Sequence, residues 1–248
     1  MIAIMNRLRV SYNWMRGYDF GDPKRNGEYR FLRSFVKNGM VVLDVGCNVG
    51  DYSQFILDLV GRDIEIHCFE PVRITFVSLQ QRFDGLHQRQ NIHLNNLGLS
   101  NKQEEAKIKI YGATAGVNSL YERRSAIDTH PELSNFSEET ILLTTLDTYL
   151  ADRRIGHVDL LKIDVEGHEL KVLEGATSTI EKGRVSVIHF EYGSCFLDSG
   201  AKLEQIYGLL SRNGYEFFRL LPYGKIRVKE FHSRLENYKY SNWVAMKA

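Results

Sequence analysis

The chain is poor in cysteine and has no long apolar run. Its 248 residues include three cysteines, Cys47, Cys68 and Cys195, and no Cys-x-x-Cys pair. Such few and scattered cysteines exclude a disulfide framework and a cysteine zinc site, and they indicate buried thiols in a reducing, cytoplasmic compartment. No stretch reaches the roughly 20 apolar residues of a membrane helix, so no transmembrane segment is expected.

The chain also lacks a net charge of either sign. Its 32 Lys and Arg residues oppose 31 Asp and Glu residues, which leaves a net charge of +1. No overall field would therefore attract nucleic acid or an anionic membrane, and no nucleic-acid partner is expected. Residues 1–28 lack the apolar core of a secretion signal and mix arginines with apolar side chains. We expect this segment to pack as a cap on its own domain, with peripheral membrane contact as the alternative.

Strand patterns and helix patterns alternate along most of the chain. Apolar strand patterns cover residues 41–45, 65–70, 92–99, 158–165 and 185–193. Helical patterns cover residues 51–60, 71–86, 146–153, 168–183 and 201–214, and Asp147 is the expected cap of the third. This alternation predicts one α/β domain, residues 1–248, with a parallel sheet covered by helices on both faces. Two closing strand patterns, 215–221 and 242–247, have no helix between them and predict an antiparallel finish.

The region between the strand pattern 92–99 and the helical pattern 146–153 has a weaker periodicity of apolar residues. Residues 107–111 and 142–145 are the expected strands there. Between them, residues 112–140 form a long stretch rich in Gly, Ser, Asn and mixed charge. A gap of this length inside a compact domain is usually functional, so we expect a substrate loop that covers the acceptor with Arg123, Arg124 and His130.

The stretch LDVGCNVGDYS carries the first chemical signal. Asp44 ends a buried strand, and Gly46 and Gly50 let the following turn approach a ligand without a Cβ in the way. The helix that begins at Asp51 points its free N–H groups at the same space. Glu70 ends the next strand, 20 residues after Gly50, where an acid accepts both hydroxyls of a ribose. The turn and Glu70 together predict an adenosine-containing ligand.

The motifs resemble those of one methyltransferase family. The turn breaks the G-x-G-x-x-G dinucleotide pattern, and D-x-G-x-N-x-G resembles motif I of class I S-adenosylmethionine-dependent methyltransferases. CFEPV at 68–72, NNLGLS at 95–100, TTLDTYL at 144–150 and VDLLKIDVEGHELKVLEGA at 158–176 are similar to motifs of the FkbM family. The resemblance implies a Rossmann-like, seven-stranded, mostly parallel sheet with an antiparallel last strand. It also implies methyl transfer to a hydroxyl of a sugar, glycolipid or polyketide product.

The resemblance and the strand-end positions together give the candidate cofactor residues. Asp44 and Asn48 are expected near the amino acid end of S-adenosylmethionine, Glu70 at its ribose, and Asn96 and Leu97 beside its adenine. The full expected set is Asp44, Gly46, Asn48, Gly50, Glu70, Asn96, Leu97 and Asp164.

Three residues near the ends of later strands are the candidate catalytic groups. They are Asp164, His168 and Glu191. A hydroxyl is a poor nucleophile and needs a base, and the ordinary pKa of a histidine, about 6.5, suits His168 to that role. Asp164 and Glu191 are hard oxygen ligands that could hold Mg²⁺, but without a third ligand in view a metal is possible and not expected. Glu166 has the plainer expected role of an acid at a helix start.

Three other functions compete with a small-molecule or glycan O-methyltransferase. The first is a nucleic-acid (RNA ribose) methyltransferase, against which the near-zero net charge argues. Amino-group methylation through a D-P-P-Y motif is excluded because the four prolines are never adjacent. The second is a dinucleotide-dependent dehydrogenase. The third is a protein that binds the cofactor without catalysis, which the intact acids at the strand ends disfavour.

Overall fold

The computed structural model describes residues 17–18, 21–61, 63–85, 91–112, 116–127 and 130–248. The expected N-terminal cap lies mostly outside these residues, as does Leu86, the last member of the helical stripe predicted for 71–86. No helix within the described ranges has the length and apolar character needed to span a bilayer.

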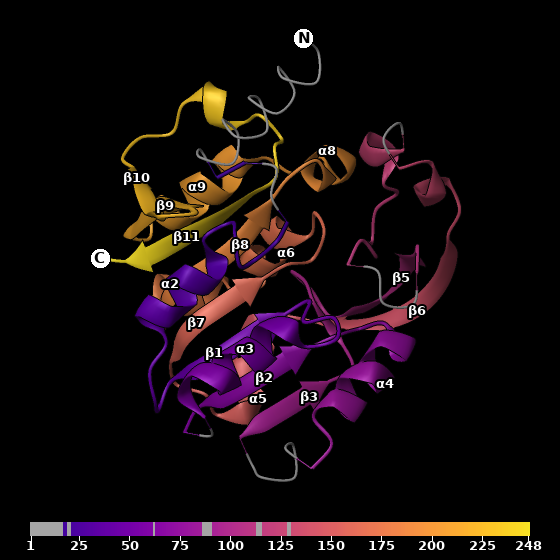
Figure 1. Cartoon of the computed structure of the whole chain (residues 1–248), viewed down its shortest axis with the longest axis horizontal. Coiled ribbons are helices and arrows are strands. Elements are labelled where there is room, and N and C mark those ends of the chain that lie inside the picture. Colours follow the sequence, from indigo (N-terminus) through magenta and orange to yellow (C-terminus); the bar gives the residue numbers. More distant parts are fainter. Residues whose placement is uncertain (1–16, 19–20, 62, 86–90, 113–115, 128–129) are drawn as a thin grey trace.

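The described residues form one large sheet of eight strands (Figure 1). Their order is β10-β9-β11-β8-β7-β1-β2-β3. In chain order the bounds are β1 Val41–Val45, β2 Glu65–Phe69, β3 Ile92–Asn95, β7 Val158–Ile163, β8 Val185–Tyr192, β9 Tyr215–Leu221, β10 Gly224–Val228 and β11 Ser241–Lys247. Strands β8, β7, β1, β2 and β3 pair in parallel. The sequence-based prediction of a mostly parallel sheet is confirmed.

The last strand inserts antiparallel between β8 and β9, as expected. The predicted count of seven strands was one too low, because β10 adds an edge strand antiparallel to β9. Its side chains are largely solvent-exposed, Ile226 among them. A strand without a buried face has no alternation of apolar and polar residues, so it could not be predicted from the sequence.

Helices cover both faces of the sheet. Helices α2 (Glu28–Phe35), α3 (Asp51–Val60) and α4 (Arg73–Arg82) pack on one face. Helices α5 (Leu146–Arg153), α6 (Glu169–Glu174), α7 (Thr177–Glu181), α8 (Cys195–Ser199) and α9 (Leu203–Ser211) build the core of the other. Alternate residues of β1 divide between the two cores, as the two-residue period of a strand requires: Val42 belongs to one, and Leu43 and Val45 belong to the other.

Asp147 has a different role from the one predicted. The expected helix over 168–183 is two short helices, α6 and α7. Asp147 accepts hydrogen bonds from the backbone N–H groups of Ser178 and Thr179, both at 2.9 Å, and so fixes the start of α7. Thr145 caps α5 instead, accepting from the N–H of Thr148 at 3.1 Å.

A small second sheet stands beside the first, at the right of Figure 1. It has the order β4-β6-β5, with β4 at Gly98–Leu99, β5 at Glu104–Ile110 and β6 at Ser137–Thr144. The strand expected over 92–99 is therefore divided between two sheets. Strand β6 also begins earlier than predicted, so residues 137–140 are a strand and not part of the loop. Two 3-10 turns, Arg124–Ala126 and Pro131–Ser134, lie in the described parts of that loop.

Candidate active site

The turn after β1 is shaped by contacts within the protein. Gly46 has φ +79°, and a Cβ placed there would lie 1.8 Å from the carbonyl oxygen of Asp164. Gly50 has φ +87° and faces the ring of Phe83, which a Cβ would meet at 2.6 Å. The turn thus needs both glycines for close packing of the chain on itself. Gly46 borders both cavities of the site, whereas Gly50 is absent from their described lining.

Two cavities in the described part of the chain meet at this turn. The Glu70 cavity, about 130 Å³, lies between the ends of β1 and β2 and the second sheet. The Glu191 cavity, about 290 Å³, lies under the start of α2 and reaches Tyr240. Gly46, Asn48 and Asp164 line both cavities. The two hollows therefore form one elongated site along the carboxyl ends of the central strands, where an open α/β sheet binds its ligands.

Glu70 and Asp44 are both buried at the strand ends. The Glu70 carboxylate accepts hydrogen bonds from the N–H groups of Asn48 at 3.0 Å and Val72 at 2.9 Å. Asp44 accepts from the hydroxyl of Ser53 at 2.6 Å. Burial raises the pKa of Glu70 to about 7 and that of Asp44 to about 6. Such costly burial of two carboxyls is expected where a cationic or hydroxylated ligand completes their environment.

Three carboxylates gather where the two cavities meet. Oxygens of Asp164, Glu166 and Glu191 all lie within 4.8 Å of one another. Sequence reasoning assigned Glu166 to a helix start, but its backbone lies in the left-handed region, φ +53°, and this turns it toward the cluster. Lys162 partly balances the negative charge, with its Nζ 3.2 Å from Asp164 Oδ2, as their alternation along the strand predicts. Burial raises the pKa of Glu166 to about 7 and that of Glu191 well above the ordinary glutamate value.

His168 is engaged through both of its ring nitrogens. Its Nε2 lies 2.9 Å from the hydroxyl oxygen of Ser100, and its Nδ1 lies 2.8 Å from that of Tyr121. Burial lowers its pKa to about 4. The imidazole lines the Glu70 cavity, its low pKa makes it a weak base, and its hydrogen bonds hold it in place. These contacts favour a positioning role over the general-base role that the sequence suggested.

Asn96 and Leu97 do not face the site in the way expected of adenine neighbours. The Asn96 amide donates to the carbonyl oxygens of Glu70 and Pro71, both at 3.0 Å, and so fixes the turn that carries Glu70. Leu97 packs against the main core. The next two residues in the chain, Gly98 and Leu99, line the described part of the Glu70 cavity instead.

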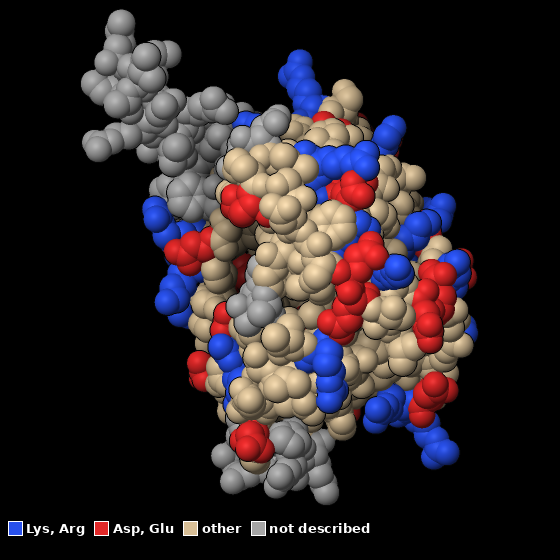
Figure 2. All heavy atoms as spheres, turned by 90° about the vertical axis from the view of Figure 1, so that its right-hand side faces the viewer, with Lys and Arg blue, Asp and Glu red and all other residues tan. Residues whose placement is uncertain are grey.

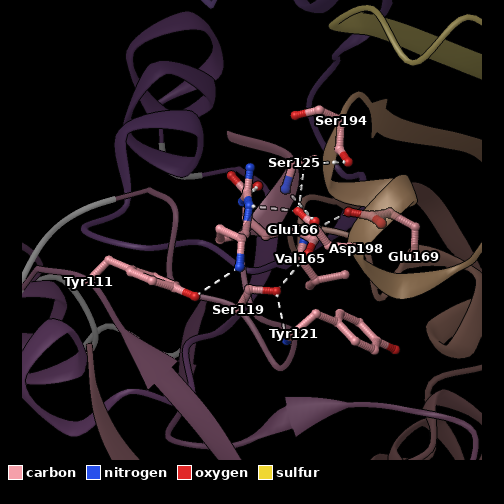
Figure 3. Close-up of polar contacts among 10 residues, drawn as sticks. Tyr111, Ser119, Tyr121, Ser125, Val165, Glu166, Glu169, Ser194 and Asp198 are labelled. Carbon is pink, nitrogen blue, oxygen red and sulfur yellow. Dashed lines mark hydrogen bonds and ion pairs between the residues drawn. The ribbon is translucent and has the colours of Figure 1, made fainter. Parts of the chain in front are cut away.

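Hydrogen bonds and an ion pair hold the segment 116–127 against the turn that follows β7 (Figure 3). The Ser119 hydroxyl donates to the carbonyl oxygen of Glu166 at 2.8 Å, and Arg123 forms an ion pair with the Glu166 carboxylate. The Ser125 hydroxyl donates to Asp198 at 2.7 Å. Sequence reasoning named the loop but gave no sign of these contacts, because each joins residues more than 40 positions apart.

The three charged residues expected over the acceptor lie in different places. Arg123 is buried, and its Nε is 3.6 Å from Asp198. Arg124 is exposed and pairs with Glu122, and His130 is exposed and pairs with Glu132. Arg123 alone of the three joins the site.

Comparison with known proteins identifies the family. The profile described as "Methyltransferase FkbM domain" matches residues 44–217, which is more than half of the chain. The chain belongs to the FkbM methyltransferase family. The matched region begins at Asp44 of the glycine turn and contains Glu70 and all three carboxylates of the cluster.

Two curated proteins resemble this FkbM methyltransferase. "Methyltransferase 1" of Beauveria bassiana (strain ARSEF 2860) is 25% identical over 144 residues, covering 54% of this chain and 57% of that protein. "31-O-demethyl-FK506 methyltransferase FkbM" of Streptomyces tacrolimicus is 26% identical over 182 residues, covering 60% of this chain and 69% of that protein. The chain thus spans between about half and two thirds of the length of these relatives.

A solved structure has the same fold. It is the FkbM methyltransferase of Methylobacillus flagellatus KT, with a TM-score of 0.51 and 12% identity. The match covers 98% of this chain and 60% of that chain. The Rossmann-like architecture of this FkbM domain is therefore shared with a distant relative.

Proposed function

We propose that this chain is an O-methyltransferase that uses S-adenosylmethionine to methylate a hydroxyl of a small molecule or glycan, such as a sugar, glycolipid or polyketide. The observation that carries the proposal is the position of Asp164. This carboxylate borders both cavities and lies within the cluster formed with Glu166 and Glu191.

The two ends of the site suit the two ends of the cofactor, its nucleoside and its amino acid part. Glu70, held by two backbone N–H groups, offers its carboxylate to the ribose hydroxyls, with Gly98 and Leu99 beside the nucleoside. Asp44 and Asp164 line the other cavity and suit the cationic amino acid end. S-adenosylmethionine, when bound, supplies an electrophilic methyl group on a positively charged sulfur. Among the described residues that line the site, acidic side chains outnumber the single lysine, Lys162, and this favours the cation over a dinucleotide, whose pyrophosphate needs basic side chains.

The chain itself supplies the proton acceptor. A hydroxyl must lose its proton as its oxygen is methylated, and a nearby carboxylate can take that proton. Asp164 reaches both cavities, and burial gives Glu191 a raised pKa, which makes it a stronger base than an exposed glutamate. We assign proton removal to Asp164, with Glu191 supporting it, and a positioning role to His168. Glu166 is the third candidate ligand that the sequence did not show, so Asp164, Glu166 and Glu191 are the residues that would hold an Mg²⁺ ion. The ion pair of Lys162 with Asp164 already balances part of their charge.

The apolar walls of the Glu70 cavity suit the adenine of the nucleoside whose ribose Glu70 would hold. Ile108, Ile141 and Leu143 of the second sheet line it together with Leu120. Figure 2 shows Lys and Arg interspersed with Asp and Glu on the face that carries β5 and β6, without a continuous basic surface for RNA. The S. tacrolimicus relative is named for a 31-O-demethyl-FK506 substrate, which supports a hydroxyl as the methyl acceptor.

The part of the stretch 112–140 that precedes β6, residues 112–136, remains the proposed acceptor loop. Gly116, Asn118 and Leu120 line the Glu70 cavity together with Asp164 and Glu166, which supports this role. Limited proteolysis with and without S-adenosylhomocysteine and an acceptor tests it, with cleavage in this stretch as the readout. Protection by both ligands together is expected, and unchanged cleavage would contradict an acceptor role.

Calorimetry and product analysis test the proposed function in two steps. S-adenosylhomocysteine should bind the wild type, and Glu70→Gln should weaken binding about 10- to 100-fold through lost charged hydrogen bonds. The control variant Glu105→Gln, on the exposed part of β5, should bind like the wild type. Methyl-labelled cofactor is then offered with methyl glycosides, hydroxylated macrolides and a short RNA. Label on an oxygen of the first two classes supports the proposal, and label on nitrogen or on the RNA alone overturns it.

A further inference from the structure

A cluster of two histidines and one glutamate lies on β2 and β3, outside the site described above. Glu65 Oε1 is 3.0 Å from His67 Nε2 and 3.4 Å from His93 Nε2. Glu65 and His67 are two positions apart on β2 and share a face, and His93 of β3 is the direct register partner of His67. Three potential ligand atoms from adjacent strands therefore converge on one point.

A chain of hydrogen bonds fixes which nitrogen of His67 carries the proton. The Asn95 amide donates to the carbonyl oxygens of Cys68 at 3.0 Å and His93 at 3.1 Å, so its Oδ1 is left as an acceptor. The Tyr149 hydroxyl donates its single proton to that Oδ1 at 3.2 Å. Its oxygen must then accept from His67 Nδ1–H, which lies at 2.8 Å. In neutral His67 the lone pair is consequently on Nε2.

In this tautomer two hydrogen-bond acceptors lie next to each other with no hydrogen between them. The Nε2 lone pair of His67 points at the carboxylate oxygen of Glu65, 3.0 Å away. Two lone pairs at hydrogen-bond distance repel unless a cation lies between them. A metal ion would satisfy all three acceptors at once.

We propose that Glu65, His67 and His93 bind a divalent transition metal of the zinc class. Two imidazoles and a carboxylate are typical zinc ligands, and Zn–N and Zn–O bonds of about 2.0–2.2 Å place tetrahedral ligand atoms roughly 3.3–3.5 Å apart. The measured separations from Glu65, 3.0 and 3.4 Å, are close to that spacing. The Tyr149 hydroxyl acts as the outer hydrogen-bond partner that orients a metal-bound histidine.

A metal ion can reach this cluster from solvent, because two of its three side chains are partly exposed. The side chains of Glu65 and His93 are 44% and 31% exposed, whereas that of His67 is 2% exposed. The two rings stack with an interplanar angle of 15°, so binding of one ion by both histidines requires the partly exposed His93 ring to turn. The remaining coordination position faces solvent and takes water.

The site is structural and separate from catalysis. Glu65 begins β2, and Glu70 follows the end of the same strand, about 16 Å away at 3.3 Å per residue. A bound ion would join the edge strand β3 to its neighbour β2 and stabilise the folded state through binding.

Metal titration of the full chain tests the proposal. Zn²⁺ is titrated by calorimetry, and Co²⁺ is followed by its visible absorption, which distinguishes tetrahedral coordination. The wild type should bind one equivalent of the metal ion and gain thermal stability. Glu191→Gln should bind the metal ion like the wild type, because Glu191 belongs to the separate carboxylate cluster. His93→Ala and Glu65→Gln, at partly exposed positions, should lose binding, and Tyr149→Phe should weaken it about 10- to 100-fold. His130→Ala is the matched control, because it removes an exposed histidine paired with a single glutamate.

Three results would overturn the proposal. They are no binding of Zn²⁺ or Co²⁺ to the wild type, unchanged binding in His93→Ala, or a site lost in Glu191→Gln and retained in Glu65→Gln. Circular dichroism of each variant establishes that the lost binding is not lost folding.

Discussion

Arg123 and Glu166 form a buried ion pair that joins two distant parts of the chain. Their side chains are 8% and 14% exposed, and the pair connects the segment between β5 and β6 to the turn that follows β7. Asp198 on α8 lies 3.6 Å from the same guanidinium. The pair therefore links a wall of the Glu70 cavity to the carboxylate cluster.

Removal of this pair should destabilise the domain. Arg123→Gln leaves Glu166 and Asp198 buried without their cation, and we expect the free energy of unfolding to fall by about 3 kcal/mol. Arg124→Gln is the matched control, since its partner Glu122 is exposed, and it should change stability by less than about 0.5 kcal/mol. Urea denaturation measures both. Equal effects of the two substitutions would show that burial of the pair is unimportant.

The close packing around Gly46 can be tested by comparison with a glycine that has a similar φ but open space around it. Gly46 and Gly200 have φ of +79° and +74°, but no heavy atom of the described chain lies within 4 Å of a Cβ on Gly200, which is in the left-handed helical region. Gly200→Ala should cost about 1 kcal/mol from the left-handed backbone alone. Gly46→Ala adds a clash with the Asp164 backbone and should cost about 3 kcal/mol and also weaken S-adenosylhomocysteine binding. Similar losses in thermal denaturation would argue against the close packing as the reason for Gly46.

Glu169 makes the stability of the protein depend on pH. It is fully buried, and burial raises its pKa from the ordinary 4.5 to about 8. Between these values the folded state holds a proton that the unfolded state has released. This group's contribution to stability is therefore complete below about pH 4.5 and is lost as the pH rises to about 8, with a slope of about 1.4 kcal/mol per pH unit.

Glu169→Gln tests this dependence. The variant keeps an oxygen for the N–H of Val165, which Glu169 accepts at 3.0 Å, but it does not titrate. Its free energy of unfolding, measured by urea at several pH values, should decline less than that of the wild type between pH 5 and pH 8. Parallel curves would mean that Glu169 is ionised in the folded state.

The roles assigned to Asp164 and His168 predict different kinetic losses. Asp164→Asn removes the proton acceptor and should lower kcat about 100-fold or more. His168→Gln retains hydrogen-bonding groups toward Ser100 and Tyr121 and should lower kcat less than about 10-fold. The pH–rate profile of His168→Gln should match that of the wild type. A larger loss in His168→Gln, with a displaced acidic limb, would return the base role to the histidine.

The sequence alone determined most of the central sheet. Strong apolar patterns such as those of Val41–Val45 and Val158–Ile163 lie in strands with two buried faces, where most positions are apolar. The acids at strand ends were equally readable, because a parallel sheet brings Asp44, Glu70 and Asp164 to one edge regardless of the detailed packing. The family motifs, which are local stretches of sequence, added the identity of the ligand.

Only the tertiary structure decided the features that depend on distant contacts. The exposed strand β10 has no buried face to create a pattern, and β4 became separate from β3 by pairing with β6, about 45 residues later. His168 read as a base until Ser100 and Tyr121 were seen on its two nitrogens. Glu166 joined the cluster because its backbone is left-handed and Arg123 holds its carboxylate. Hydrophobic periodicity is a local property that one chain segment carries by itself. The protonation and orientation of a polar side chain are set by neighbours that only the folded chain brings within hydrogen-bond distance.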